Sequence, residues 1–128
     1  PPTPPPGLPL SRGRCHSSDG HPSGVAGGTG ARPIHGRCRA AGRPLWGGGM
    51  LETGVGRAAQ LALAALPGFT LPGDISATDR YYERDITAPF TLNREDSTIT
   101  VPDGPGLGVA IDHAQLAAVT LRRESFGG

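Results

Sequence analysis

The side chains best suited to bind a metal ion lie in the first 38 residues of the sequence. They are Cys15, His16, His21, His35 and Cys38. A structural zinc site draws its ligands from two closely spaced pairs, and the spacing here does not fit that pattern. The sequence therefore predicts no metal site in this region.

Two further motifs could bind an ion or a phosphate. The glycine-rich stretch Gly24–Gly30 resembles a phosphate-binding loop, but no strand precedes it and no Lys-Ser/Thr pair follows it. An acidic run could bind a cation; it consists of Asp74, Asp79, Glu83 and Asp85. Because Arg80 and Arg84 are interleaved with these carboxylates, the run favours a solvated ion-pair network over a cation site.

The basic residues exclude several kinds of chemistry. All 12 are arginine, so the chain cannot form a Schiff base, carry a phosphate-loop lysine or use a lysine as general base. Residues 1–44 hold six of these arginines and a single acid, Asp19. Aromatic residues that could stack on bases are not interleaved with them, so the pattern does not favour nucleic-acid binding.

The composition indicates that the chain begins with a low-complexity segment. Gly 21 and Pro 14 are abundant in 128 residues, and residues 1–33 show almost no aliphatic periodicity, so we expect this segment to be disordered. The two cysteines are too few for a disulfide-stapled scaffold. No apolar run is long enough to span a membrane, and no secretory leader is recognisable, so we expect a soluble, cytoplasmic protein without a membrane partner.

An ordered unit is predicted from residue 34 onwards. Residues 37–42 have the pattern of a helix end with Gly42 as terminator. Pro44–Trp46 then predicts a short buried strand, which a glycine turn at 47–49 follows. Val55–Leu66 predicts a helix, with Thr53 as its N-cap and a stop at the following Pro-Gly. This order is typical of one unit of a parallel α/β fold.

The rest of the chain is richer in loops. Thr98–Val101 alternates like a strand, and Val109–Ile111 is a candidate for a last short strand. Asp112 and Gln115 have capping-box spacing and predict a helix that extends through Thr120. The tail that follows is polar and is expected to fray.

The stretch Pro44–Phe90 closely resembles the C-terminal part of the o-succinylbenzoate synthase / N-acylamino-acid racemase family, in the enolase superfamily. The match is carried by Gly48-Gly49-Met50-Leu51-Glu52-Thr53-Gly54, Leu66-Pro67, Phe69 to Asp74, Asp79-Arg80-Tyr81 and Asp85-Ile86. The continuation Val101–Val109 also matches, so the resemblance covers residues 34–121. Three short motifs in the correct order are far more specific than any one of them alone.

The resemblance implies a C-terminal fragment of a (β/α)8-type barrel joined to an α+β capping domain, the whole barrel needing about 250 residues. Residues 34–68 would be the last helix–strand–helix of the barrel, and residues 69–128 a segment that returns to the cap. In this scheme Pro44–Trp46 is strand eight. The loop at its carboxyl end would then supply substrate-binding residues, namely Gly48, Gly49, Met50 and Glu52.

Both the loop and its neighbours also have a simpler interpretation. Glycines at a strand end let backbone N–H groups approach a ligand, but they also permit a tight turn. Tyr81 and Tyr82 would line the pocket from the return segment or would serve only in packing.

The resemblance also implies a function. The intact family member would dehydrate a cyclohexadiene carboxylate to o-succinylbenzoate in menaquinone synthesis, through proton abstraction next to a carboxylate. In the family, two lysines act as acid and base, and three Asp/Glu residues hold Mg²⁺. No catalytic or metal-binding residue can be assigned in this chain, which we expect to be inactive alone. The alternatives are an N-acylamino-acid racemase and, from another class, a non-enzymatic Arg/Gly-rich binding protein.

The sequence departs from the family pattern at three positions. Gly47 replaces a cysteine, Arg43 replaces an apolar residue where burial of a charge would be costly, and Gly36 lies inside a helix. Upstream of about Ala31 the resemblance vanishes, which suggests that residues 1–33 are read in a different frame from the parent enzyme. Because the barrel strands beside strand eight are not in this sequence, we expect that Leu61, Leu63 and Leu66 cannot all be buried.

Overall fold

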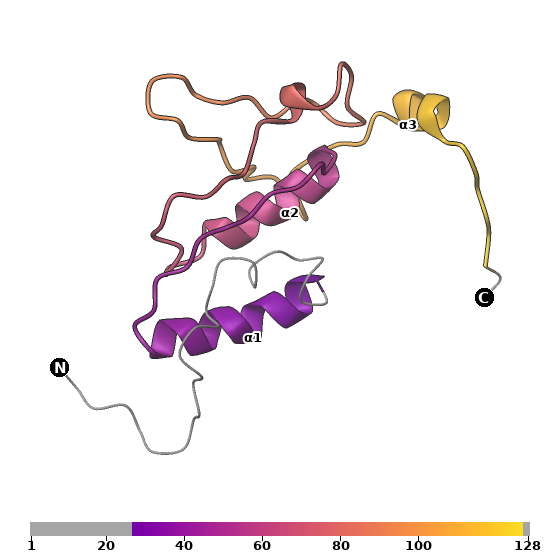
Figure 1. Ribbon diagram of the computed structural model, residues 1–128. Helices are drawn as coiled ribbons and strands as arrows, with labels where there is room; N and C mark the ends of the chain where they lie inside the picture. The colour runs from indigo at the N-terminus through magenta and orange to yellow at the C-terminus, as the bar shows by residue number, and fades with distance from the viewer. Residues whose placement is uncertain (1–26, 127–128) are drawn as a thin grey trace.

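The structure is a computed structural model that describes residues 27–126. Its elements are α1 (Gly27–Ala40), α2 (Gly54–Ala64), the short 3-10 helix η2 (Thr78–Arg80) and α3 (His113–Val119). Helices α1 and α2 run in the same direction, and the extended chain between them returns along their length (Figure 1). Among the described residues, no helix is both long and apolar enough to cross a membrane.

Helix α1 begins earlier than the sequence predicts. Residues 27–33 were expected to be disordered, and this expectation is wrong for them, because the helix starts at Gly27. Ala31 and Cys38 lie seven residues apart and therefore on one face, and both are buried. Burial of this face stabilises a helix that contains Pro33 and several glycines, which local propensity alone does not favour. The remaining part of the segment expected to be disordered, 1–26, lies outside the described residues.

The end of α1 agrees with the sequence. Gly42 has a φ of +63°, the left-handed conformation that glycine adopts without strain. The N–H of Gly42 donates to the carbonyl of Arg39, and the N–H of Arg43 donates to the carbonyl of Cys38. These two bonds form a Schellman motif and confirm the predicted terminator. The Arg43 side chain is exposed, so the costly burial expected there does not occur.

The predicted strand at Pro44–Trp46 is reduced to a single parallel bridge between Leu45 and Phe69. The flanking bonds join Leu45 N–H to the Gly68 carbonyl (2.9 Å), Leu71 N–H to the Leu45 carbonyl (3.1 Å) and Asp74 N–H to the Gly47 carbonyl (3.2 Å). The paired segment contains Pro72, which has no N–H to donate, so the ladder cannot continue as a regular strand. The described residues accordingly contain no closed barrel.

Helix α2 begins one residue before the predicted range and ends two residues before the predicted end, and Thr53 occupies its N-cap with an extended backbone. The Thr53 side chain makes no capping hydrogen bond. Its place is taken by Asp85, whose carboxylate accepts from the Gly54 N–H, 31 residues earlier, at 2.7 Å in a buried position. The return segment therefore caps α2 from outside the helix.

The core forms where α2 meets this return segment. Ala58, Leu61 and Phe90 are buried together, with Ile75, Ile99 and Val109 packed against them. Leu63 and Leu66 are only half-buried. The three leucines are thus not all buried, as the sequence predicts.

Helix α1 packs on the same body through His35, whose ring stacks on that of Phe69 with centroids 5.8 Å apart. This contact gives His35 a packing role.

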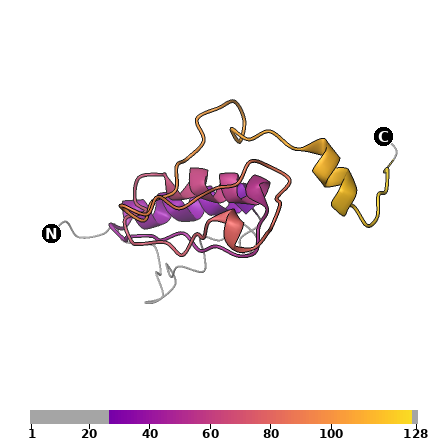
Figure 2. The ribbon, with the colours of Figure 1, turned by 90° about the horizontal axis from the view of Figure 1, so that it is seen from above.

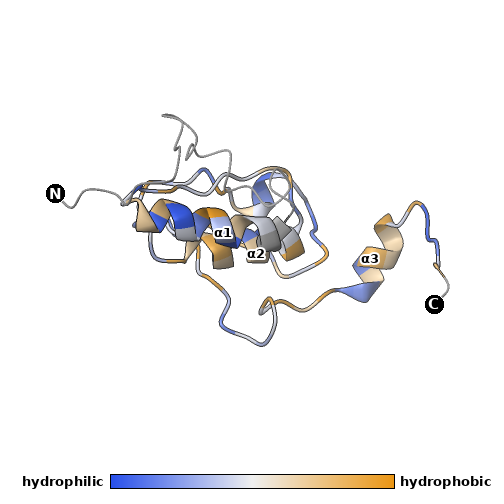
Figure 3. Cartoon of the chain, turned by 90° about the horizontal axis from the view of Figure 1, so that it is seen from below, coloured by the Kyte–Doolittle hydropathy of each residue, from blue (hydrophilic) through white to orange (hydrophobic). Residues whose placement is uncertain are grey.

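The C-terminal part agrees with the sequence in its helix but not in its strands. No strand forms at 98–101 or 109–111 in the described structure, because a strand needs a partner and these segments have none beside them. Asp112 caps α3 by accepting from the Gln115 N–H at 2.9 Å, which confirms the capping prediction. Helix α3 has no buried residue, and it lies apart from the other helices (Figures 2 and 3).

Candidate functional site

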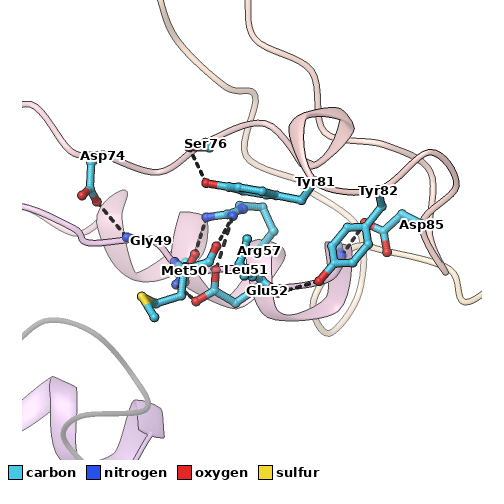
Figure 4. Close-up of polar contacts among 12 residues, drawn as sticks. Gly49, Met50, Leu51, Glu52, Arg57, Asp74, Ser76, Tyr81, Tyr82 and Asp85 are labelled. Atoms are coloured by element: carbon cyan, nitrogen blue, oxygen red, sulfur yellow. Dashed lines mark hydrogen bonds and ion pairs between the residues drawn. The ribbon is translucent and has the colours of Figure 1, made fainter. Parts of the chain in front are cut away.

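The candidate site is the loop Gly48–Glu52, which leaves the carboxyl end of the Leu45 segment and leads into α2 (Figure 4). Gly49 donates its N–H to a carboxylate oxygen of Asp74 at 2.8 Å. A Cβ at Gly49 would lie 2.7 Å from Nη1 of Arg57 and 3.2 Å from the carbonyl oxygen of Asp74. Glycine is therefore required here by close packing within the chain.

Arg57, on the first turns of α2, contacts the loop. Its side chain is fully buried. Nη2 donates to the carbonyl of Met50 at 2.9 Å and lies 3.3 Å from a carboxylate oxygen of Glu52. Nη1 donates to the Gln60 amide oxygen at 2.7 Å. Sequence reasoning did not find Arg57, although a lone arginine in an Ala- and Leu-rich helix is a signal that could have pointed to it.

The carboxylate of Glu52 is engaged within the chain. One oxygen accepts from the N–H of Met50 at 2.8 Å, and the other accepts from the Gln60 side-chain amide at 2.6 Å. Together with the Arg57 ion pair, these contacts place Glu52 in the support of the loop. The N–H groups of Gly49 and Met50 both donate to carboxylates of this chain, so at these two positions they do not point to a ligand.

The outer surface of the loop is apolar. Met50 is 63% exposed and Leu51 is 66% exposed. With its polar backbone groups directed inward, the loop presents two large flexible side chains outward. Such a surface fits the hydrocarbon part of a small molecule better than its charged end.

Both tyrosines of the return segment lie near the loop (Figure 4). The Tyr82 hydroxyl donates to the Leu51 carbonyl at 2.6 Å, so this residue contacts the loop directly. The Tyr81 hydroxyl donates to Ser76 at 3.1 Å, and the ring lies 5.8 Å from the Arg80 guanidinium. Asp74, Arg57, Glu52 and Tyr82 therefore fix the backbone of three successive loop residues.

The acidic run does not form the predicted ion-pair network. Asp74 and Asp85 each bind a backbone N–H instead, and Arg84 pairs at 2.8 Å with Asp112, which lies outside the run. Hydrogen bonds from the Gln115 N–H and from Arg84 hold the pKa of Asp112 below its ordinary value. The pKa of Asp96 is lowered in the same way by the hydroxyl and N–H of Thr98.

A divalent cation does not fit the described part of the chain. Within residues 27–126, no three Asp, Glu, His or Cys side chains converge as a metal site would require. Two hollows in the surface, of about 690 and 360 Å³, are lined by the return segment around Tyr82 and Arg84, and neither is lined by the loop.

The order helix, strand segment, glycine-rich loop, helix defines an α/β unit whose candidate site lies where the strand segment ends. Residues 10–115 match the family described as Enolase C-terminal domain-like, and the chain belongs to this family. The match begins at residue 10, so the resemblance starts further upstream than the residue 34 expected from the sequence. This start counts against a different reading frame for residues 10–33.

Two enzyme names recur among the curated relatives of this chain. The chain is 58% identical over 106 residues to an N-succinylamino acid racemase of Amycolatopsis sp, a match that covers 83% of this chain and 28% of the relative. It is 47% identical over 104 residues to an o-succinylbenzoate synthase of Geobacillus stearothermophilus, a match that covers 80% of this chain and 28% of the relative. The chain thus spans little more than a quarter of the length of these relatives.

Solved structures agree with this assignment. An enolase-superfamily member from Listeria innocua Clip11262 superposes with a TM-score of 0.67 at 42% identity, covering 73% of this chain and 25% of that one. A probable mandelate racemase from Alicyclobacillus acidocaldarius superposes with a TM-score of 0.72 at 31% identity, covering 80% of this chain and 27% of that one. The helix–loop–helix unit therefore has the conformation of the corresponding part of larger enolase-superfamily proteins.

Proposed function

We propose that this chain forms one wall of the substrate site in an enolase-superfamily enzyme of the o-succinylbenzoate synthase type, which dehydrates a cyclohexadiene carboxylate. The observation that carries the proposal is the loop Gly48–Glu52. It lies at the carboxyl end of the strand segment, its backbone is fixed by four side chains, and its outward surface is Met50 and Leu51. Enzymes built on parallel α/β units place their sites at this end of the strands.

The residues of this chain would bind and orient the substrate. Met50 and Leu51 would contact its ring or alkyl part, and Tyr81 would close the site from the return segment. The chain has no lysine, and its described residues form no metal site. The acid, the base and the stabilisation of the developing enediolate must therefore come from outside these residues, and we derive no chemical step from this chain.

A racemase acting on N-succinylamino acids is the second candidate. The relative of that name is 58% identical, compared with 47% for the first synthase. Both reactions would start with removal of a proton next to a carboxylate, so the loop could serve either reaction. An apolar loop surface accepts a ring or an amino-acid side chain equally well.

A chimera tests the proposal. Residues 27–126 of this chain replace the aligned C-terminal part of the Amycolatopsis racemase, whose own remaining sequence supplies everything that this chain lacks. We expect o-succinylbenzoate formation, racemisation of an N-succinylamino acid, or both, within about tenfold of the parent. A chimera that unfolds at the parent's temperature but catalyses neither reaction would refute the proposal.

A pair of glycine variants shows whether the loop carries this activity. In the chimera, Gly49→Ala would force the loop away from Arg57 and Asp74, and a misplacement of about 1 Å can cost roughly 100-fold in rate. Gly36→Ala is the matched control, because nothing lies within 4 Å of a Cβ at that position. Equal effects of the two substitutions on the rate would show that the loop is not part of the substrate site.

A further inference from the structure

Arg57 is a fully buried cation, and within residues 27–126 its ion-pair partner is Glu52. An apolar residue of similar size would fill the same volume at no desolvation cost, and replacing buried ion pairs in this way is often neutral or stabilising. Packing therefore does not explain why the position carries an arginine.

The contacts of Arg57 explain it better. The guanidinium donates to the Met50 carbonyl at 2.9 Å, and its partner Glu52 accepts from the Met50 N–H at 2.8 Å. The pair thus holds one loop residue by both of its backbone polar groups. Gln60 completes a closed network, since it accepts from Arg57 and donates to Glu52.

The geometry requires the planar guanidinium in particular. Two of its nitrogens, held apart in one plane, reach three acceptors; a lysine would have to reach all three from a single nitrogen, without this fork. Gln60 lies three residues after Arg57 and therefore on the same face of α2, where it bonds to Glu52 of the loop.

We propose that Arg57 is a positioning residue, which acts through Glu52 and Gln60 to fix the loop and thereby the surface that Met50 and Leu51 present to substrate. This inference rests on the proposed function for its substrate, but the fixing of the loop can be measured without any activity. Arg57 itself touches no substrate, since its side chain is completely buried.

The first test measures amide exchange and thermal unfolding in the full chain. Arg57→Met should unfold at a lower temperature, because the Glu52 carboxylate loses the guanidinium beside it, and the exchange of the Met50 N–H should rise about tenfold. The double variant Arg57→Met/Glu52→Met removes both charges of the pair, so it should recover the unfolding temperature. Arg84→Met, which removes an exposed arginine paired with Asp112, is the control and should leave Met50 exchange unchanged.

Each outcome decides the question. A Met50 N–H that stays protected in Arg57→Met while the unfolding temperature falls would show that Arg57 serves the fold alone and would overturn the inference. A Met50 N–H that is already unprotected in the wild type would overturn it as well. The emission of Trp46, the single tryptophan and two residues before Gly48, gives a second signal, which should change in both Arg57 variants and remain unchanged in Arg84→Met.

The second test uses the chimera. Arg57→Lys keeps the positive charge but not the planar guanidinium with its two terminal nitrogens. It should lower kcat/KM about tenfold, mainly by raising KM, with no shift in the pH profile. An active chimera whose kcat and KM are unchanged by Arg57→Lys would overturn the positioning role and leave the proposed function intact. If the wild-type chimera is inactive but Arg57→Met changes Met50 exchange in the full chain, the proposed function is refuted and the positioning role remains intact.

Discussion

The capping of α2 by Asp85 predicts that substitution of the residue at the N-cap leaves the stability of the chain unchanged, whereas substitution of a distant residue lowers it. The Gly54 N–H is buried, and its only acceptor in the described structure is the Asp85 carboxylate at 2.7 Å. Asp85→Ala leaves this donor without a partner, which costs about 1–3 kcal/mol. It also removes a negative charge from the positive end of the helix, worth a further 0.3–1 kcal/mol or so. We expect a loss of about 2 kcal/mol in the free energy of unfolding.

The measurement is urea unfolding of the full chain, followed by the helical circular dichroism signal. For a slope of about 2 kcal/mol per molar, the midpoint should fall by about 1 M. Thr53→Ala is the matched control: it changes the residue that sequence rules assign to the cap, but the Thr53 hydroxyl makes no capping bond, so its midpoint should stay within about 0.2 M. If Thr53→Ala costs as much as Asp85→Ala, the local cap operates and our reasoning is wrong.

Three more predictions concern the other parts of the chain. Gly54→Ala should destabilise the chain more than Gly36→Ala, because its Cβ would overlap the Thr87 hydroxyl whereas Gly36 has open space; equal urea midpoints would contradict this. The stabilisation of α3 by Asp112 should be complete at a pH above 3.8, the ordinary pKa of this carboxyl group, and should be lost as the pH falls through the lowered pKa. Amide exchange in α3 should show this loss in the wild type and not in Asp112→Asn. The isolated chain, which has no lysine, should show neither synthase nor racemase turnover, and Mg²⁺-dependent turnover by a pure sample would disprove this expectation.

The features that the sequence predicted are those encoded by neighbouring residues. The stop at Gly42, the Ala- and Leu-rich α2 and the Asp112–Gln115 cap each depend on residues within one or two turns. The features it missed depend on contacts through space. Asp85 reaches α2 across 31 residues, and the start of α1 is stabilised by burial of one face in a stretch of poor helix formers.

The predicted strands failed for a related reason. Residues 98–101 have the alternation of a strand, but alternation supplies only one half of a pair. The candidate site was predicted only in part: the loop residues were found through a family resemblance, whereas the network that holds them was not. Glu52 was assigned to substrate through the same resemblance, and its contacts show that both of its carboxylate oxygens are engaged within the chain.

Three of the four side chains that fix the loop lie downstream of it, which has a consequence for synthesis on the ribosome. Gly49 is held by Asp74, Met50 by Arg57 and Leu51 by Tyr82, which follows 31 residues later. At about 5–20 residues per second, the loop emerges roughly 2–6 seconds before its last support has been synthesised. During that interval Met50 and Leu51 have no fixed place on the surface. A stall in translation between residues 52 and 82 would therefore prolong the exposure of an unsupported apolar loop, whereas a stall after residue 82 would not.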